Sequence, residues 1–494
     1  MSTEQTTPAG VPGSPSPGPG IAGIPNSEID ASCRMPLFVM FVSAAIWLII
    51  ASVFGLISSI KFHSPGFLAD IAQLTYGRVR PVFVNALIYG FGLQAGLGVS
   101  LWLVARLGRT TLAGPVFVTF GASLWNLGLT IGTLAILAGE STGFEYLEIP
   151  FYAALLIFLG YLLIGICGVL TLQQRRERPL FVSQWFILTA VFWFPWIYST
   201  ANLLLVKYPV RGVTQAVIAW WYADNLLWVW LALVGLAAIF YFIPKLLKRE
   251  LHSHYLALFA FWMLILFAGW GGIAVSAPVP AWMPTFSMIG TVLTVIPLLA
   301  VALNVQRTLA GNYSKVRSEP ALLFIAFGAG AFIVAGFMKV CGLVLDFNQE
   351  LRFTWFMPAR DLLNSYGFFA MVMFGAIYRI FPQLTGFEFP FPRFVRAHFW
   401  LAAAGVFLSV LPLAIGGVVQ TLELQNANIP FMDIVKSTLP VLRVSTIGDL
   451  LLLAGHLLFL GNAAGLLVRF SRARAMSAYA EMTADLFKTA GAKP

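Results

Sequence analysis

The sequence predicts an all-α membrane protein, a polytopic bundle of about twelve transmembrane helices, and three observations support this. Of its 494 residues, 59% are hydrophobic and only 10% are charged, and the mean hydropathy is +0.85. Soluble domains carry about 25% charged residues. Apolar runs recur along the chain, and each is long enough to cross the roughly 30 Å hydrocarbon core of a bilayer. We therefore expect lipid to surround most of the chain.

The chain divides into three predicted parts. Residues 1–35 are rich in Pro, Gly, Ser and Thr, which favours a disordered tail, and they lack the pattern of a signal peptide. Residues 36–470 hold the predicted transmembrane domain, and residues 471–494 form a basic cytoplasmic C-terminal tail. The predicted spans are 36–60, 82–106, 115–139, 150–173, 183–206, 215–243, 255–276, 283–306, 321–346, 361–384, 397–421 and 445–469.

The distribution of basic residues predicts the orientation. The side of the membrane that both termini share carries about two thirds of the 30 Lys and Arg residues. The loop after the third span, on the opposite side, holds Glu140, Glu145 and Glu148 and no basic residue. Since basic loops stay in the cytoplasm, we expect both termini to be cytoplasmic in the inner membrane. These loops also account for the formal net charge of +10, which therefore does not indicate nucleic-acid binding.

The stretch 353–386 carries the polar residues around which we expect the bundle to be organised. Arg360 and Asp361 lie in the first turn of this long apolar segment. Residues two apart on a helix point about 200° away from each other, so Arg360 and Leu362 face opposite sides. A helix with ligands at these two positions would hold one planar cofactor on each flank.

Four stretches resemble the catalytic subunit of the haem-copper terminal oxidases, most closely the cbb-type cytochrome c oxidases and the related nitric oxide reductases. They are LTYGRVRPVFVNALIYGFG (74–92), AWWYADN (219–225), YFIPK (241–245) and GAIYRIFPQLTG (375–386). The resemblance implies the subunit I fold. It also implies haem b and copper held by six histidines, because neutral imidazole ligates both metals.

None of the matching positions holds a histidine. The second-helix haem ligand falls on Phe83, the sixth-helix copper ligand on Asp224, and the tenth-helix pair on Arg360 and Leu362. The seventh-helix pair falls within 271–274, which contains no histidine. We therefore predict no catalytic, metal-binding or cofactor-binding residue, and we expect bulky side chains such as Phe83 to close most of the low-spin haem volume.

The remaining histidines and cysteines do not replace these ligands. Only one histidine lies deep in a predicted span, and a lone histidine there is more often hydrogen-bonded within the bundle than a ligand. The cysteines form no CxxC motif, so we expect no disulfide framework, zinc site or covalently attached haem. The residues are His63, His252, His254, His398, His456, Cys33, Cys167 and Cys341.

Charged residues within the spans form a candidate buried polar site. A carboxylate about ten residues into a span, such as Asp224, costs several kcal/mol unless it is paired or neutralised. We predict that Asp224 pairs with Arg360 where the copper centre would lie. In the alternative, Arg360 pairs with Asp361 and Asp224 is protonated. Lys339 and Asp449 are further candidates for internal pairing, and Arg443 matches an arginine that lies near the haem propionates in the resembled family.

These observations predict a non-catalytic relative of subunit I, a pseudoenzyme that acts as a scaffold or partner subunit of a respiratory complex. Its partners would be membrane lipid and other respiratory subunits, and the resemblance suggests membrane-anchored c-type cytochromes. One alternative is a haem- and copper-containing terminal oxidase or nitric oxide reductase in electron transport. A second is proton or ion transport, with Asp224, Lys339 and Arg360 along the path.

Overall fold

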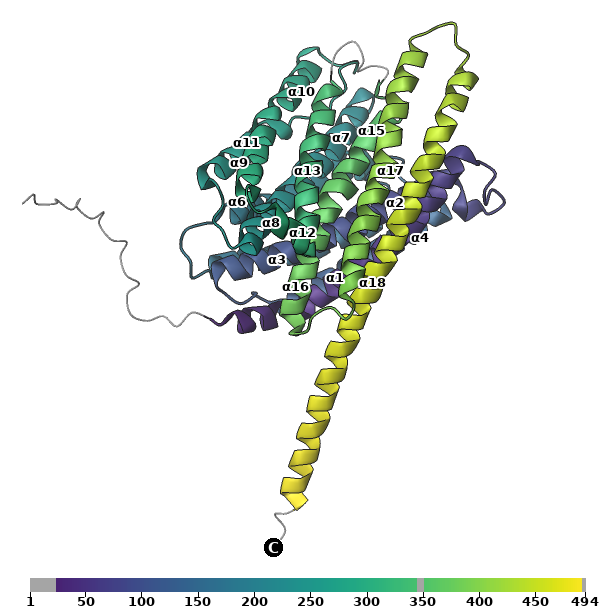
Figure 1. The fold of residues 1–494 in the computed structure, drawn as a ribbon. Helices are drawn as coiled ribbons and strands as arrows, with labels where there is room; N and C mark the ends of the chain where they lie inside the picture. Colours follow the sequence, from purple (N-terminus) through teal and green to yellow (C-terminus); the bar gives the residue numbers. More distant parts are fainter. Residues whose placement is uncertain (1–23, 344–350, 491–494) are drawn as a thin grey trace, which may run out of the picture.

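The computed structural model describes residues 24–343 and 351–490, with side chains described as far as residue 481. In these residues the secondary structure is helical and contains no strand. Eleven helices are long and apolar enough to cross a membrane, and a shorter apolar helix, His254–Ala268, occupies the place of the predicted seventh span. The predicted all-α bundle of about twelve membrane helices is confirmed (Figure 1).

The helices follow one another as α1 Asn26–His63, η1 Ala72–Leu74, α2 Tyr76–Asn85, η2 Ala86–Leu93, α3 Gln94–Gly108, α4 Pro115–Ala138, α5 Phe151–Gln173, α6 Val182–Ala201, η3 Asn202–Lys207, α7 Val213–Asp224, η4 Asn225–Trp230, α8 Leu231–Leu247, α9 His254–Ala268, α10 Trp282–Leu293, α11 Val295–Leu309, α12 Tyr313–Ser318, α13 Pro320–Cys341, α15 Phe356–Leu362, η5 Leu363–Ala370, α16 Met371–Thr385, α17 Pro392–Leu424 and α18 Phe431–Ala490.

Three spans form the centre of the bundle. In Tyr76–Gly108, Val213–Leu247 and Phe356–Thr385, the most apolar stretches are 100%, 94% and 83% buried, against 50% or less in the other long spans. Each central span contains a π-helical segment: η2, η4 and η5. Such segments occur often at functional sites because they re-aim side chains within a helix. The same three spans carry Phe83, Asp224 and Arg360.

Small residues allow these central helices to approach closely. A Cβ added at Gly90 would lie 2.6 Å from Trp47, and one added at Gly98 would lie 2.6 Å from Phe41. A Cβ at Gly328 would meet Val372 at the same distance. These glycines therefore serve helix packing.

Several helix boundaries differ from the expected spans. Helix α1 begins at Asn26, ahead of the predicted start at residue 36. Helix α9 ends at Ala268, whereas the sequence predicted a span to residue 276, and no regular helix resumes until Trp282. Gly272, with φ +102°, and the prolines at 278 and 280 explain the interruption, because neither residue type continues a helix readily.

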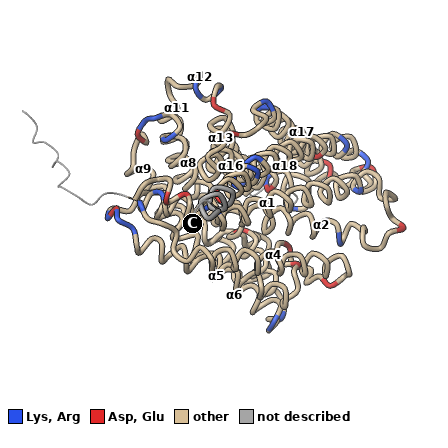
Figure 2. The backbone as a smooth tube through the Cα atoms, turned by 90° about the horizontal axis from the view of Figure 1, so that it is seen from below, with Lys and Arg blue, Asp and Glu red and all other residues tan. Residues whose placement is uncertain are grey.

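Helices α17 and α18 pack along each other at one edge of the bundle, and α18 continues far beyond it (Figure 1). Helix α18 has 60 residues, about 90 Å of helix at 1.5 Å per residue, whereas roughly 30 Å suffices to cross a bilayer. The view along the bundle in Figure 2 shows that most of the backbone belongs to uncharged residues, with Lys and Arg gathered largely on loops and helix ends.

Candidate functional site

Two cavities flank the helix that begins at Phe356. The first, here called the lysine cavity, has a volume of about 270 Å³ and is lined by Asp224, Lys339 and Arg360. The second, here called the Phe83 cavity, has a volume of about 360 Å³ and is lined by Phe83 and Leu362. The prediction that Arg360 and Leu362 face opposite flanks of this helix is therefore confirmed.

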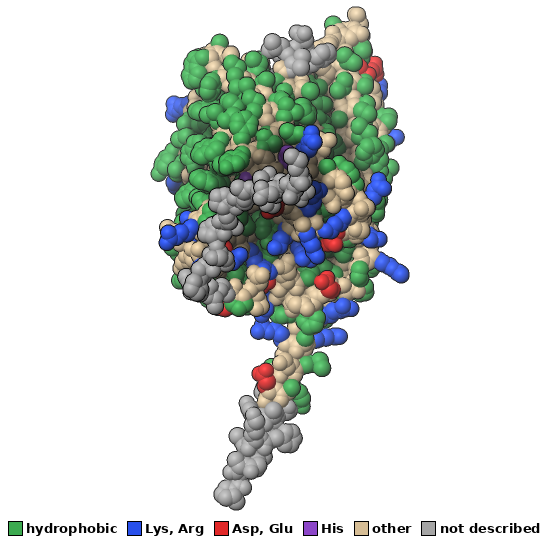
Figure 3. Space-filling model, turned by 60° about the vertical axis from the view of Figure 1, so that its left-hand side comes forward, with side chains coloured by type: hydrophobic (Ala, Val, Ile, Leu, Met, Phe, Trp, Pro, Cys, Tyr) green, Lys and Arg blue, Asp and Glu red, His purple; other side chains and the backbone are tan. Residues whose placement is uncertain are grey.

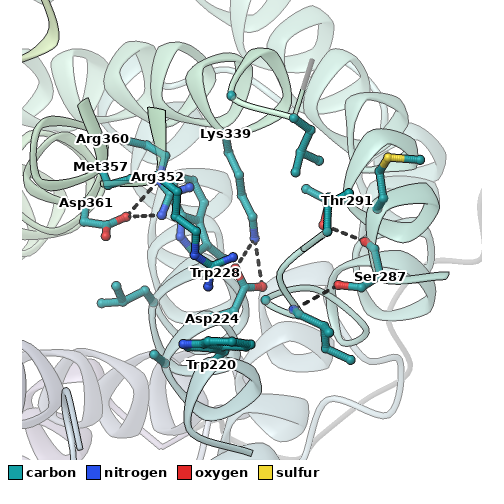
Figure 4. Close-up of a pocket in the computed structure, with 18 of the residues that line it drawn as sticks. Trp220, Asp224, Trp228, Ser287, Thr291, Lys339, Arg352, Met357, Arg360 and Asp361 are labelled. Atoms are coloured by element: carbon teal, nitrogen blue, oxygen red, sulfur yellow. Dashed lines mark hydrogen bonds and ion pairs between the residues drawn. The ribbon is translucent and has the colours of Figure 1, made fainter. Parts of the chain in front are cut away.

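A buried ion pair lies at the centre of the lysine cavity (Figure 4). The Nζ of Lys339, in the last turn of α13, lies 2.7 Å from Oδ1 and 2.8 Å from Oδ2 of Asp224, the last residue of α7. The side chains are 8% and 9% exposed. The ammonium also lies 4.8 Å from the ring centroid of Trp228. Lys339 therefore supplies the positive charge that balances the carboxylate.

The predicted ion pair between Asp224 and Arg360 is wrong. The Nε and NH2 atoms of Arg360 lie 2.9 Å and 2.8 Å from Oδ1 of its neighbour Asp361. This is the alternative pairing considered for Arg360, but Asp224 is paired with Lys339. The error has a tertiary cause: the last turn of α13 approaches the end of α7, and the spacing of residues along the chain does not reveal that approach.

The interrupted seventh span lies directly against Asp224. A Cβ added at Gly272 would lie 2.8 Å from the Asp224 Cβ and 2.6 Å from the Trp220 carbonyl oxygen. A Cβ at Gly271 would collide with the Asp224 carboxylate. The segment that matches the seventh-helix ligand pair is thus unwound, and its glycines let the backbone close over the ion pair.

Phe83 fills only part of the space beside it, where the resemblance to the oxidases places the low-spin haem. Its ring packs on Gly55, where an added Cβ would lie 2.9 Å away, and the Arg80 guanidinium lies 5.4 Å from the ring centroid. The expectation that bulky side chains close most of this volume is wrong, because the Phe83 cavity remains open beside the ring. Arg80, Asp361 and other charged groups line its wall, and closing it would remove these charges from water.

The other predicted polar residues lie away from the cavities. Arg443 is exposed on α18 and is not among the residues that line either cavity. The Ser409 hydroxyl donates a 3.1 Å hydrogen bond to Asp449. His398 and His456 lie in a separate aromatic cluster, with ring centroids 6.0 Å apart. They bond through Nδ1 to the Tyr378 hydroxyl at 2.9 Å and the Ser52 hydroxyl at 2.7 Å.

Sequence reasoning missed Arg352, which lines both cavities from the segment before α15. Its guanidinium lies 4.6 Å from the ring centroid of Trp220, and burial together with the charge of Arg360 lowers the pKa of Arg352. The available signal was its position, since it is a basic residue just before the predicted tenth span, on the side of the membrane that was expected to carry fewer basic residues.

Two acids in the loop between α4 and α5 also belong to this region. Glu145 lines both cavities, and the surrounding protein, with a smaller contribution from Asp361, raises the pKa of this carboxyl although its side chain stays exposed. Burial raises the pKa of Glu148 to about 7, and the Asn85 amide donates a 2.8 Å hydrogen bond to it. Nearby, the buried Tyr89 and Tyr222 hydroxyls share a short hydrogen bond.

The donor set does not fit haem or copper at the positions that the resemblance assigns. Phe83 and Leu362 have no lone pair, and an arginine side chain has donors only. Both carboxylate oxygens of Asp224 contact the Lys339 ammonium. Throughout residues 24–343 and 351–481, no group of three or more His, Cys, Asp and Glu side chains is arranged to hold a metal ion.

Comparison with known proteins agrees with the fold. The family described as "Cytochrome C and Quinol oxidase polypeptide I" matches residues 36–451. A cytochrome c oxidase subunit 1 homolog of Azorhizobium caulinodans is 27% identical over 465 residues, which cover 89% of this chain and 84% of the relative. The cbb3-type cytochrome c oxidase subunit CcoN1 of Stutzerimonas stutzeri is 25% identical over 437 residues, or 85% of this chain and 92% of the relative.

Among solved structures, a haem-copper terminal oxidase dimer superimposes with a TM-score of 0.69 at 15% identity, covering 87% of this chain and 84% of its own. At this identity the match shows the fold alone. With the family match over most of its length, the chain belongs to the cytochrome c and quinol oxidase polypeptide I family, the subunit I family of the haem-copper oxidases.

Proposed function

We propose that the chain is a non-catalytic member of this family that works as a scaffold or partner subunit in a respiratory membrane complex. The observation that carries the proposal is the Lys339 ammonium on both oxygens of Asp224. A metal cation at this position would have to displace a buried ammonium that already balances the carboxylate.

The proposed partners are lipid and other subunits of a respiratory complex, with membrane-anchored c-type cytochromes as one class. Large apolar side chains project from the outward faces of several peripheral helices, such as Phe117 on α4 and Trp400 on α17, which are 62% and 67% exposed. Side chains of this kind suit lipid or the helices of another subunit. The relative from Stutzerimonas stutzeri is itself named as a subunit of an oxidase.

Both termini are proposed to be cytoplasmic. The face in Figure 3 carries hydrophobic side chains over its upper part and many Lys and Arg side chains over its lower part, from which α18 extends. Basic side chains collect on the cytoplasmic side of membrane proteins. This distribution supports the orientation drawn from the sequence.

The test is an absorption spectrum and metal analysis of the full-length protein, purified from membranes with copurifying proteins identified. The expected result is no Soret band above background, no stoichiometric copper or iron, and specific copurification of other respiratory subunits. One haem per chain retained through purification would refute the scaffold role and support the oxidase alternative. Purification as an isolated chain without partner subunits would also count against it.

Proton or ion transport is a second candidate because the lysine cavity combines a buried ion pair with the exposed acid Glu145. Reconstitution into liposomes with an internal pH dye distinguishes this candidate from a scaffold. A proton flux that Asp224→Asn abolishes would favour transport. A flux equal to that of empty liposomes would exclude proton transport.

A further inference from the structure

The wall of the lysine cavity carries three cations and three acids, and two of the cations form ion pairs with two of the acids. Lys339 is paired with Asp224, and Arg360 is paired with Asp361. Arg352 is the third cation on the wall. Among the described residues, no carboxylate lies within ion-pair distance of its guanidinium. The guanidinium of Arg352 is therefore available to a ligand of negative charge.

The N–H donors of Arg352 are available to a ligand. The guanidinium lies over the Trp220 ring, with 4.6 Å between its central carbon and the ring centroid. A guanidinium carries five N–H donors in one plane, and a contact with an aromatic ring does not pair them with an acceptor oxygen. Within the part of the chain that the structure describes, none of these donors makes a hydrogen bond. A planar group with two oxygens on one edge matches this fork.

The surroundings favour an anion over a neutral ligand. Figure 4 shows Lys339, Arg352 and Arg360 around the same space, each contributed by a different segment of the chain. Burial and the nearby Arg360 charge lower the pKa of Arg352, which means that they destabilise its charged form. The wall also carries the exposed acid Glu145, whose pKa is raised by the surrounding protein and the Asp361 charge.

We propose that the lysine cavity is a binding site for a small planar oxyanion of single negative charge, held by the edge of Arg352. A carboxylate and an inorganic ion such as nitrate share this chemistry. The volume of about 270 Å³ lies just below the range of roughly 300–1,000 Å³ that is typical of ligand sites, so the ligand is small. The positive charges of Lys339 and Arg360 also attract an anion, although each of them is already paired with a carboxylate. The site does not depend on the scaffold role.

The test is isothermal titration of the full-length protein in detergent with sodium acetate and sodium nitrate, at constant ionic strength against sodium chloride. The expected result is saturable binding of at least one planar oxyanion above the chloride background. Acetate alone would identify an organic carboxylate site, and nitrate alone an inorganic one. No saturable binding of either ion would overturn the proposal.

Variants of Arg352 and Arg80 distinguish binding at the proposed site from a general attraction between anions and the basic residues of the protein. Arg352→Gln should weaken binding about ten- to a hundredfold, because it removes a charge-assisted, bidentate contact. Arg352→Lys keeps the charge and loses the fork, so it should weaken binding less. Arg80→Gln is the matched control, since Arg80 lines the Phe83 cavity and not the lysine cavity, and it should leave affinity within about twofold.

Equal weakening by Arg80→Gln and Arg352→Gln would overturn the proposal, because it would indicate either nonspecific attraction or binding in the Phe83 cavity, which both arginines line. Helical circular dichroism of each variant checks the fold. If Arg352→Gln fails to fold, the Arg352→Lys and Arg80→Gln comparison decides in the same way. The absorption spectrum recorded on the same sample tests the scaffold role independently, so the two proposals fail separately.

Discussion

Removing one partner of the Asp224–Lys339 pair should strongly destabilise the protein. Both side chains are less than 10% exposed, so each substitution leaves an uncompensated charge in a region of low dielectric. Breaking a buried pair of this kind typically costs about 3–5 kcal/mol. We therefore expect Asp224→Asn and Lys339→Met each to lower the free energy of unfolding by about that amount. The double variant should recover much of the loss, because neither charge remains.

The measurement is a double-mutant cycle on purified protein, with unfolding in detergent followed by circular dichroism. We expect a coupling energy of at least about 2 kcal/mol, since the two groups are in direct contact. The surface pair Lys436–Asp433 is the matched control, with side chains 66% and 56% exposed. Exposed pairs are worth about 0.2–1 kcal/mol, so its coupling should fall in that range.

A second cycle separates the observed pair from the one that the sequence predicted. The coupling between Asp224 and Arg360 should be much smaller, because Arg360 contacts Asp361 instead. A coupling between Asp224 and Lys339 below about 0.5 kcal/mol would refute the reasoning, as would single variants as stable as the unsubstituted protein.

Three further outcomes follow from the structure. Burial raises the pKa of Glu148 from 4.5 to about 7, so the native state holds a proton that the unfolded chain releases. Stability should therefore fall by on the order of 3 kcal/mol as pH rises from below 4.5 to above 7, and Glu148→Gln should flatten this dependence in unfolding measured across that range. Gly272→Ala should lower the thermal unfolding temperature more than Gly311→Ala does, because both glycines have positive φ but only at Gly272 would the new Cβ meet other atoms. Equal decreases in the unfolding temperature would argue against close packing over Asp224. A reporter that is active only in the periplasm, fused after Pro494, should stay inactive, and activity would reverse the proposed orientation.

The sequence alone determined the fold class and the number of spans. Apolar runs of about twenty residues have few stable arrangements in lipid, because every backbone polar group must be satisfied within the membrane. The helical period likewise predicted that Arg360 and Leu362 face opposite flanks, since this depends only on local geometry. The stretches shared with the oxidase family predicted family membership, which the family match confirmed.

Only the tertiary structure decided which charges pair and which spaces stay open. Asp224 and Lys339 are 115 residues apart, and their contact depends on how the end of α13 meets the end of α7. Hydropathy specifies which segments enter the membrane, but helix register and tilt come from packing among neighbours. For the same reason, the sequence did not predict the position of Arg352 on the cavity wall or the cavity beside Phe83. Ion pairs and cavities arise where several helices meet, and no single segment encodes that meeting.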